Sequence, residues 1–381
     1  MQSSESRRTL SVGFATMASL LVSCSAPAGV WLADSTPGPA QDAACTRPPH
    51  ESGLEPVDWT FFSSPGAATP PAWCESVGPV VQHRPESGPG RAVDVLPVVT
   101  WNIRVGAGDI IELVSDLRQG ALTGRPESDF ILLLQEAYRS GPEVPDSNAK
   151  LTTRIDMPPP SGERADVVEL ARRLDLHLFY VPSMPNGADS DAAPNREDRG
   201  NAILSTMPLE EHQAIELPFE AQRRVAIAAT VAGVASDGTP WQLRVASGHL
   251  DTRSRVNRFL DSVGPGRTRQ ARALDASLRG DAVVLGADLN SWSAGFLEGA
   301  VDLLHHSFPD TAPTREATFV VGGILPRTLD HLLLRLNPES TAQTHRIDRR
   351  YGSDHYPLLG LIQMRHPSVQ VSQVQSASSG G

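Results

Sequence analysis

Short apolar runs and helical patterns alternate through the middle of the chain. Several of the apolar runs are rich in β-branched residues and too short for a buried helix. An unbroken run such as 130–134 is typical of a strand that is covered on both faces. The segments expected to be strands are 96–103, 130–134, 176–181, 201–205, 225–231, 243–247, 282–287, 328–334 and 358–362.

Three segments have the 3.6-residue period of a helix, and they cover 109–117, 164–174 and 267–278. The apolar face of the first is formed by Ile110, Leu113, Val114 and Leu117. Asp109 and Glu112 have the spacing of a capping box, and Gly120 can end this helix. Many short strands with few helices predict an α/β (α+β) fold, in which two packed, mixed β-sheets are flanked by helices.

The amino-terminal residues 1–24 have the pattern of an export signal. Arg7 and Arg8 precede an apolar stretch, residues 10–22, that is shorter than the ~20 residues needed to span a bilayer. The stretch closes on Cys24 and resembles a bacterial lipobox, in which the cysteine is lipidated. An ordinary signal peptide cleaved near Ala26 or Ala28 and a cytosolic start are the alternatives. We expect an exported protein that is anchored to a membrane through Cys24 or is secreted or periplasmic.

Residues 25–92 hold twelve of the 32 prolines and are expected to form a tether that is partly ordered around its aromatic residues. In an exported protein Cys45 and Cys74 would pair as a disulfide, and two unpaired thiols are the alternative. Residues 93–366 form the expected globular domain, and 367–381 a disordered tail. We expect the protein to be a monomer.

The formal net charge of −11 argues against a protein that coats nucleic acid without sequence preference, since that affinity comes from many basic residues. One stretch differs, because Arg253 to Arg272 contains six arginines and a single acid, Asp261. Arginine suits bidentate phosphate contacts. The stretch is interpreted either as a groove for a polyanion such as nucleic acid or as a solvated helix face.

Polar residues interrupt the apolar strands at or near their ends. Taken singly, an Asn or Asp there is usually a turn residue. A series of such interruptions indicates a site built on a rigid sheet instead. The interrupting residues are Asn102, Gln135 and Glu136, Arg199 and Asn201, His249, Asp288 and Asn290, Asp330, Asp354 and His355.

In this order the interruptions resemble the endonuclease/exonuclease/phosphatase superfamily. The resemblance covers about residues 95–365 and implies a four-layer sandwich. The spacing in SDHYP and in GADLN is specific when both occur, whereas TWN alone is weak. The matching segments are TWN (100–102), LLLQE (132–136), RGNAILS (199–205), SGHLD (247–251), LGADLN (285–290), LDHLLL (329–334) and SDHYPL (353–358).

The resemblance also implies a metal site. Glu136 and Asn102 would hold a divalent cation, with Asp354 supporting the metal or its waters. Mg²⁺ is expected, because it prefers oxygen ligands and binds through one or two carboxylates, and Mn²⁺ or Ca²⁺ are alternatives.

The remaining residues take catalytic roles by the same resemblance. Asp330 would accept a hydrogen bond from His355, while Asp288 and Asn290 would orient the attacking water and the scissile phosphate. Residues that would bind the phosphate oxygens are His249 and Asn201, with Arg199 either assisting or solvated. Asp288 and His355 both remain candidates for the general base.

The implied reaction is metal-dependent hydrolysis of a phosphoester by in-line attack of water. A nuclease is expected first, and a phosphodiesterase or phosphatase for a lipid headgroup or small molecule, of the sphingomyelinase kind, is the alternative. Only 5% of residues are aromatic, and no apolar run expected to be exposed follows residue 93, which favours the nuclease. A surface binding protein that kept the fold without catalysis is the third hypothesis.

Overall fold

The computed structural model describes residues 54–62, 73–86, 91–145, 163–186, 196–252, 265–291, 299–312, 314, 316–321 and 324–364. The expected signal peptide, Cys24, Cys45, residues 253–264 and the expected tail lie outside these ranges. No helix among the described residues has the length and apolar character needed to span a membrane.

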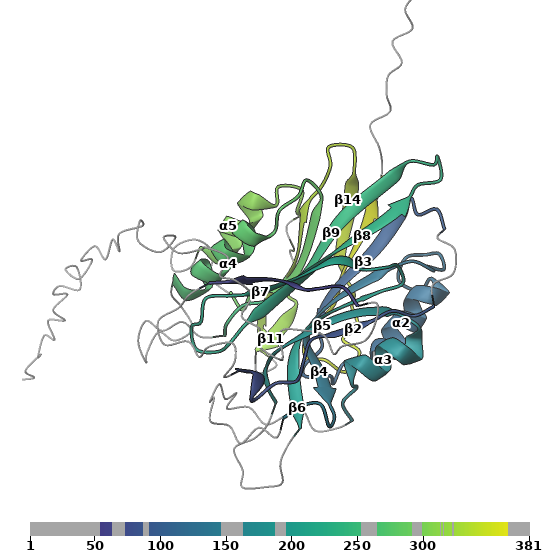
Figure 1. Cartoon of the computed structure of the whole chain (residues 1–381). Coiled ribbons are helices and arrows are strands. Elements are labelled where there is room, and N and C mark those ends of the chain that lie inside the picture. The colour runs from purple at the N-terminus through teal and green to yellow at the C-terminus, as the bar shows by residue number, and fades with distance from the viewer. Residues whose placement is uncertain are drawn as a thin grey trace, which may run out of the picture. The chain divides into compact units, whose positions relative to one another are not determined.

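Two large β-sheets form the framework of the described residues (Figure 1). The six-stranded sheet has the order β1–β7–β8–β9–β10–β13 and mixes parallel with antiparallel pairs. Its strands are β1 (Asp58–Phe61), β7 (Glu210–Glu216), β8 (Val225–Val234), β9 (Pro240–His249), β10 (Val283–Asp288) and β13 (Asp330–Arg335).

The seven-stranded sheet has the order β14–β15–β3–β4–β6–β5–β2, and its β3 and β4 are parallel. Its strands are β2 (Val81–His83), β3 (Val95–Asn102), β4 (Ile131–Ser140), β5 (His177–Pro185), β6 (Glu197–Ser205), β14 (Thr341–Arg346) and β15 (Leu358–Gln363). A separate two-stranded hairpin joins β11 (Phe319–Val321) to β12 (Leu325–Arg327).

Helices cover the outer face of each sheet. α2 (Ile110–Gln119) and α3 (Val167–Leu174) share a hydrophobic core with the seven-stranded sheet. α4 (Pro265–Ser277) and α5 (Ala300–Ser307) share another with the six-stranded sheet, and Figure 1 shows the two helix pairs on opposite sides. The predicted class is therefore confirmed: two packed mixed sheets lie between helices.

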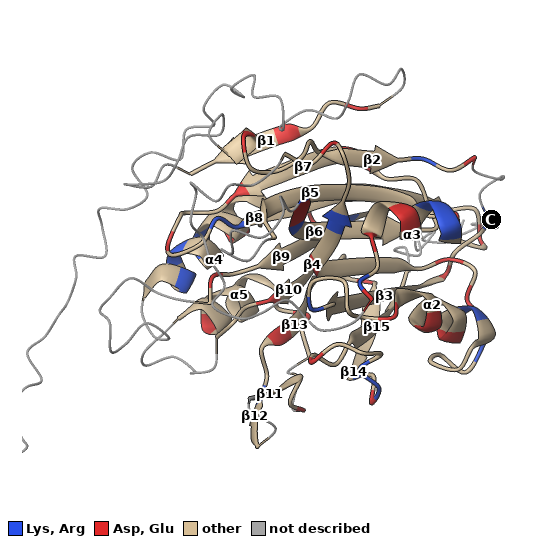
Figure 2. Ribbon diagram, turned by 90° about the horizontal axis from the view of Figure 1, so that it is seen from below, with Lys and Arg blue, Asp and Glu red and all other residues tan. Residues whose placement is uncertain are grey.

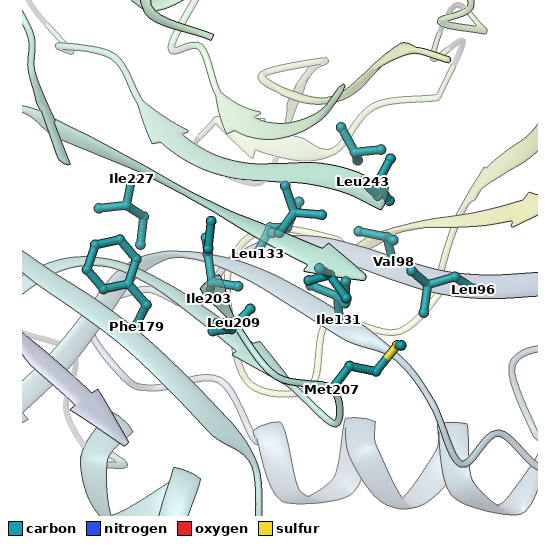
Figure 3. Packing of buried hydrophobic residues seen from close by; sticks show 14 of the residues in the cluster. Leu96, Val98, Ile131, Leu133, Phe179, Ile203, Met207, Leu209, Ile227 and Leu243 are labelled. Atoms are coloured by element: carbon teal, nitrogen blue, oxygen red, sulfur yellow. The ribbon is translucent and has the colours of Figure 1, made fainter. Parts of the chain in front are cut away.

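The third core lies between the two sheets and follows from the period of two along each strand. On β3, Val98 faces the opposite sheet while Val99 faces α2. Leu133 on β4 and Leu243 on β9 point into the same inter-sheet space, where Figure 3 shows the labelled side chains of both sheets packed together. A strand buried on both faces reads as an unbroken apolar run, as the sequence showed.

The predicted helix α2 has the expected ends. The Asp109 carboxylate accepts a hydrogen bond from the Glu112 N–H at 2.9 Å, and Gly120 ends the helix in the left-handed conformation with φ 80°. Only a residue without Cβ adopts this conformation freely, and a Cβ at Gly120 would also lie 2.4 Å from the Arg125 carbonyl carbon.

The segment before residue 93 contributes an edge strand to each sheet. β1 pairs in parallel with β7, and β2 pairs antiparallel to β5. Between them, the buried Arg139–Asp198 ion pair fixes the loop, since Asp198 accepts from the Gly78 N–H and Arg139 donates to the Pro79 carbonyl. Cys74 is disulfide-bonded, and the other cysteines lie outside the described residues. The ordered unit thus begins within the range expected to be a tether.

The β11–β12 hairpin corrects one expectation. Ile324 is 88% exposed and Leu325 43% exposed, so an apolar exposed segment does follow residue 93. Figure 2 shows this hairpin projecting from the two sheets. The run 319–325 is short and contains two glycines, so it has no clear period that would predict this segment from the sequence.

Candidate active site

The site occupies one end of the inter-sheet space, where the inward face of each strand changes from apolar to polar. On β3, Val98 is followed on the same face by Thr100 and then Asn102. Strands β9 and β10 repeat this gradient, ending in His249 and Asp288. The same alternation that builds the core therefore brings the polar strand ends together. In Figure 2 most of β4, β9 and β10 is uncharged, in keeping with this pattern.

Gln135 on β4 forms the layer between the core and the site. Its amide Nε2 lies 3.0 Å from Ser247 Oγ, 3.1 Å from the Leu133 carbonyl oxygen and 3.3 Å from both Thr100 Oγ1 and the Gly286 carbonyl oxygen. Thr100, Ser247 and Gly286 each stand two residues before a site residue. Gln135 thus joins three site-bearing strands of both sheets at one point.

Glu136 reaches the site through a β-bulge. Regular alternation would point it away from Gln135, toward the helices, but the pairing of β4 with β6 shifts register between Leu134 and Ala137. Glu136 has φ 53°, a left-handed backbone that is uncommon for residues other than glycine. Asn290, just beyond β10, has φ 49°. Such strained residues cluster at functional sites.

Asp288 is the centre of a buried polar cluster. Its Oδ2 accepts from Asn102 Nδ2 at 2.9 Å and its Oδ1 from the Asn290 N–H at 2.9 Å. The same Oδ2 lies 3.5 Å from His249 Nε2 and 4.0 Å from His355 Nε2. We call Asn102, Asp288, Asn290, Asp330, His249 and His355 the acid–base cluster.

His355 is oriented from both ends of its ring. Its Nδ1 is 2.8 Å from Asp330 Oδ2, and its other nitrogen points to Asp288. The Phe319 ring lies 4.6 Å from the imidazole between centroids. Thr318 Oγ1 accepts from the Asp330 N–H, so the residue just before β11 fixes the backbone at Asp330. The Asp330–His355 pair predicted from the sequence is therefore formed.

Burial and charge move the pKa values of the cluster apart. Burial, and then the charge of Asp330, raise the pKa of Asp288 to about 7. Burial opposes the charged form of His355, but Asp330, Asp288 and Asp354 outweigh it and raise its pKa to about 10. Burial holds the pKa of His249 well below its ordinary value. Near neutral pH His355 is thus a cation, His249 is neutral, and Asp288 is close to its titration point.

The donor set fits a hard divalent cation. Glu136 forms no ion pair with another described residue, and Asn102 Oδ1 accepts one hydrogen bond, from the Arg104 N–H, which leaves it a second lone pair. Asp354 lies 3.5 Å from Arg104 Nε and stands next to His355. These are carboxylate and amide oxygens, the ligands that Mg²⁺ prefers.

A second group of possible ligands is formed by Asp288, Asp330 and His355, whose ligand atoms lie within 4.8 Å of one another. A metal bound there needs a lone pair on His355. The ring instead shares a proton with Asp330 and carries its second proton at neutral pH, because its pKa is raised. The trio thus combines a proton-sharing Asp330–His355 pair with a third buried side chain, Asp288.

A cavity opens beside the acid–base cluster, and we call it the arginine cavity. It holds about 210 Å³ of atom-free space, including the part that opens to solvent. Its lining residues are Glu136, Ser183, Met184, Arg199, Gly200, Asn201, Arg224 and His249. Gly200 is required there, because a Cβ would lie 1.9 Å from the Val181 carbonyl oxygen. The cavity therefore joins the expected cation side to two buried guanidinium groups.

The structure brings all ten sequence-predicted site residues to this end of the sheets. Asn201 and Arg199 line the arginine cavity with Glu136, and Asp354 flanks His355. Arg224 was missed, although it directly precedes an apolar strand. Its signal in the sequence is a charged residue at the beginning of an apolar strand, where the other predicted residues mark mostly strand ends.

The arginine-rich stretch needs a correction in its described part. Arg267 is buried and donates to the carbonyl oxygens of Asp251 and Thr252, and Arg269 pairs with Glu220. Only Arg272, among the three described arginines of this stretch, is exposed. Two of the three therefore hold the protein together and are not available to line a polyanion groove.

No protein-family model matches the chain, and no curated protein is significantly similar in sequence. Similar solved structures include an endonuclease/exonuclease/phosphatase family protein from Leptotrichia buccalis (13% identity, TM-score 0.45) and sphingomyelinase C from Streptomyces griseocarneus (16%, 0.41). A third is D. rerio TDP2 complexed with a single-strand DNA product (15%, 0.44). Each match covers 71% of this chain and 99–100% of the other.

Proposed function

We propose that the protein is a divalent-cation-dependent phosphoester hydrolase and that its substrate is a nucleic-acid phosphodiester. One observation carries the proposal. A buried carboxylate, Asp288, is held among amide and imidazole groups directly beside a cavity that contains two cations, Arg199 and Arg224. Proton acceptor, proton donor and anion-binding groups thus adjoin one another in a water-poor site, as hydrolysis of a phosphate ester requires.

Asp288 is the better candidate for the general base. A base works best when its pKa is near the working pH, and the pKa of Asp288 is raised to about 7. His355 is unsuited to that role at neutral pH because its raised pKa leaves it protonated. As a cation oriented by Asp330 it can stabilise negative charge that develops on the phosphate or donate a proton to the leaving oxygen.

Glu136 and Asn102, with Asp354 nearby, are the residues that would hold the cation. Bound there, Mg²⁺, Mn²⁺ or Ca²⁺ would neutralise charge on phosphate oxygens. The amide of Asn201 and the neutral ring of His249 line the cavity next to Glu136 and would orient those oxygens. Asn290 Nδ2 lies 2.8 Å from His249 Nε2, which leaves Nδ1 as the protonated nitrogen.

A second candidate is a phosphodiesterase that acts on a lipid headgroup. The β11–β12 hairpin favours it, because Ile324 and Leu325 are exposed on a hairpin whose Phe319 contacts the His355 ring. An exposed apolar segment marks an interaction site with protein or membrane. The two buried arginines favour the nuclease, since a choline headgroup carries a positive charge and would be repelled by them.

The test is an activity panel on the full chain with Mg²⁺, Mn²⁺ and Ca²⁺. Plasmid DNA, RNA, sphingomyelin in vesicles and bis-p-nitrophenyl phosphate are the substrates. We expect cleavage of nucleic acid that is abolished by EDTA and by Asp288→Asn. Cleavage of sphingomyelin alone, reduced at least tenfold by Ile324→Asp, would establish the second candidate. Inactivity on every substrate would support a binding protein without catalysis.

A further inference from the structure

The arginine cavity is displaced sideways from the acid–base cluster. In the six-stranded sheet the order β13–β10–β9–β8 leads from Asp330 through Asp288 and His249 to Arg224, which directly precedes β8. In the other sheet the order β3–β4–β6 leads from Asn102 through Glu136 to Arg199. Neighbouring strands are ~4.8 Å apart, so the guanidinium groups begin one to two strand spacings from the reacting centre.

Both arginines are buried without a carboxylate partner. Arg199 is 6% and Arg224 5% exposed, and neither forms an ion pair with any described residue. Arg199 donates to Met184 Sδ at 3.1 Å, while Arg224 donates to Gln222 Oε1 at 2.7 Å. Arg224 Nε, which can only donate, has no hydrogen-bond partner among the described residues. Burying an unpaired charge is costly, so an anion is expected to complete the site.

Other buried arginines of this chain show the contrast. Arg139 forms a two-pronged pair with Asp198. Arg223, the neighbour of Arg224, donates to both carboxylate oxygens of Glu216 at 2.9 and 2.7 Å. Each of these guanidinium groups has its fork matched by a carboxylate of the protein. Arg199 and Arg224 have no such match, although they line a cavity that is partly open to solvent.

The charges of the cavity exceed what one phosphodiester brings. Two guanidinium groups face one carboxylate, Glu136, and the neutral His249 adds no charge. A divalent cation on the Glu136 side would increase the positive excess. A single phosphodiester carries only one negative charge, and the planar fork of arginine is matched best by a second group of the phosphate type.

We infer that Arg199 and Arg224 bind a second phosphate of the substrate, next along the strand to the phosphate that is cleaved. The inference rests on the proposed function and deepens it. It requires a substrate with at least two consecutive phosphates, and it sets nucleic acids and terminally phosphorylated oligonucleotides apart from isolated phosphodiesters. In this arrangement Asn201 and His249, which line the same cavity, contact the phosphate that reacts.

The experiment compares three dinucleotides that differ only in a terminal phosphate. The full chain is assayed on TpT, on pTpT and on TpTp with the cation that supports the greatest activity. We expect kcat/KM for one of the two phosphorylated forms to exceed that for TpT at least 20-fold. In Arg224→Gln this ratio falls below 3, and in Arg224→Lys, which keeps the charge but not the fork, it takes an intermediate value. Arg272→Gln, which removes an exposed arginine, retains the wild-type ratio.

A binding measurement tests the arginine cavity independently of turnover. Calorimetry with inorganic phosphate in EDTA is expected to give at least tenfold weaker binding in Arg224→Gln, with folding checked by circular dichroism. Cleavage of all three dinucleotides at equal rates overturns the second-phosphate site while leaving the hydrolase standing. Unchanged phosphate binding in a folded Arg224→Gln overturns it as well. The arginines could instead bind the phosphate that reacts. Turnover of p-nitrophenyl phosphate that is faster than that of bis-p-nitrophenyl phosphate, and that is abolished in Arg224→Gln, would show this and overturn the inference.

If no dinucleotide, plasmid or small diester is cleaved with any of the three cations, the proposed hydrolase fails. The phosphate calorimetry then still decides whether Arg224 binds an anion.

Discussion

The acid–base cluster and the arginine cavity adjoin each other but differ in how complete they are. In the cluster, each carboxylate has a partner. Asp330 pairs with His355, and Asp288 accepts hydrogen bonds from the Asn102 side chain and from the Asn290 backbone. In the cavity, Arg199 and Arg224 are similarly buried, and neither forms an ion pair with a described carboxylate, although Glu136 lines the same cavity. Two neighbouring regions are thus buried to a similar degree, but the charged groups are paired in one and unpaired in the other.

The difference separates what the protein provides from what it leaves to a ligand. A paired cluster holds its proton-transfer groups in place before substrate arrives, so little reorganisation is needed during the reaction. An unpaired cavity gains most of its stabilisation when an anion enters. Substitutions in the first region should therefore act on turnover, and those in the second on the choice and binding of substrate.

The largest effect is expected in the cluster, from His355→Asn. Removing a proton-transferring cation should lower kcat roughly 10²–10⁴-fold, because the Asp330–His355–Asp288 chain is broken. Steady-state kinetics at saturating substrate measure it. His331→Asn is the control, since this buried histidine neighbours Asp330 but contacts His305 of α5 at 3.4 Å. Equal losses in both variants would show that the comparison reflects stability and not chemistry.

A smaller effect is expected from Gln135→Met, which tests the support that the two regions share. Losing the amide should destabilise the fold by about 1–3 kcal/mol and lower kcat roughly tenfold. Urea unfolding and kinetics, measured together, separate the two effects. Gln82→Met on β2 is matched in chemistry, because this buried glutamine exchanges hydrogen bonds with the Glu55 backbone far from the site. A normal kcat in Gln135→Met would contradict a positioning role.

The last prediction has the smallest bearing on turnover and concerns the pH dependence of stability. The pKa of Asp288 is raised in the folded state to about 7 from an ordinary 3.8, so the folded protein binds this proton more tightly than the unfolded chain. The contribution of Asp288 to stability should therefore fall as pH rises from about 4 to 7 and then level off. The Asp288→Asn variant has no carboxyl group to ionise and does not lose this stability. The difference between its Tm and that of the wild type should therefore increase by a few degrees between about pH 4 and pH 7.

Thermal unfolding in EDTA, recorded at intervals from pH 4 to pH 8, measures this difference. A Tm difference that stays constant across the window would contradict the burial of an ionising Asp288. Such a result would also contradict the different ionisation of Asp288 and His355 that the proposed mechanism uses.

Much of the fold and the site follows from the strand pattern. The inward residues of β3, β9 and β10 end in Asn102, His249 and Asp288, and a period of two suffices to place these side chains in one space. The caps of α2 were equally local, since Asp109 and Gly120 act within one turn of the helix. These features depend on neighbours in sequence and can be inferred from it.

Other features depend on partners that are distant in sequence. Glu136 enters the site through a bulge, and nothing in the letters LQEA marks the shift in register. β14 and β7 are rich in polar residues and lack an apolar run, so their pairing is set by the sheet edges they join. The sequence also does not distinguish the roles of Arg267 and Arg224. Arg267 donates to backbone carbonyl oxygens, whereas Arg224 lines an open cavity.

The two strands nearest the amino terminus have a consequence for the order of assembly. Trp59 pairs with Ala214 and Gln82 with Phe179, so each strand waits for a partner synthesised roughly 100 to 155 residues later. Among the described strands, the first two to be synthesised are then among the last to join their sheets. Because both lie at sheet edges, a pull on the amino terminus should peel them off one hydrogen bond at a time before the rest of the fold yields.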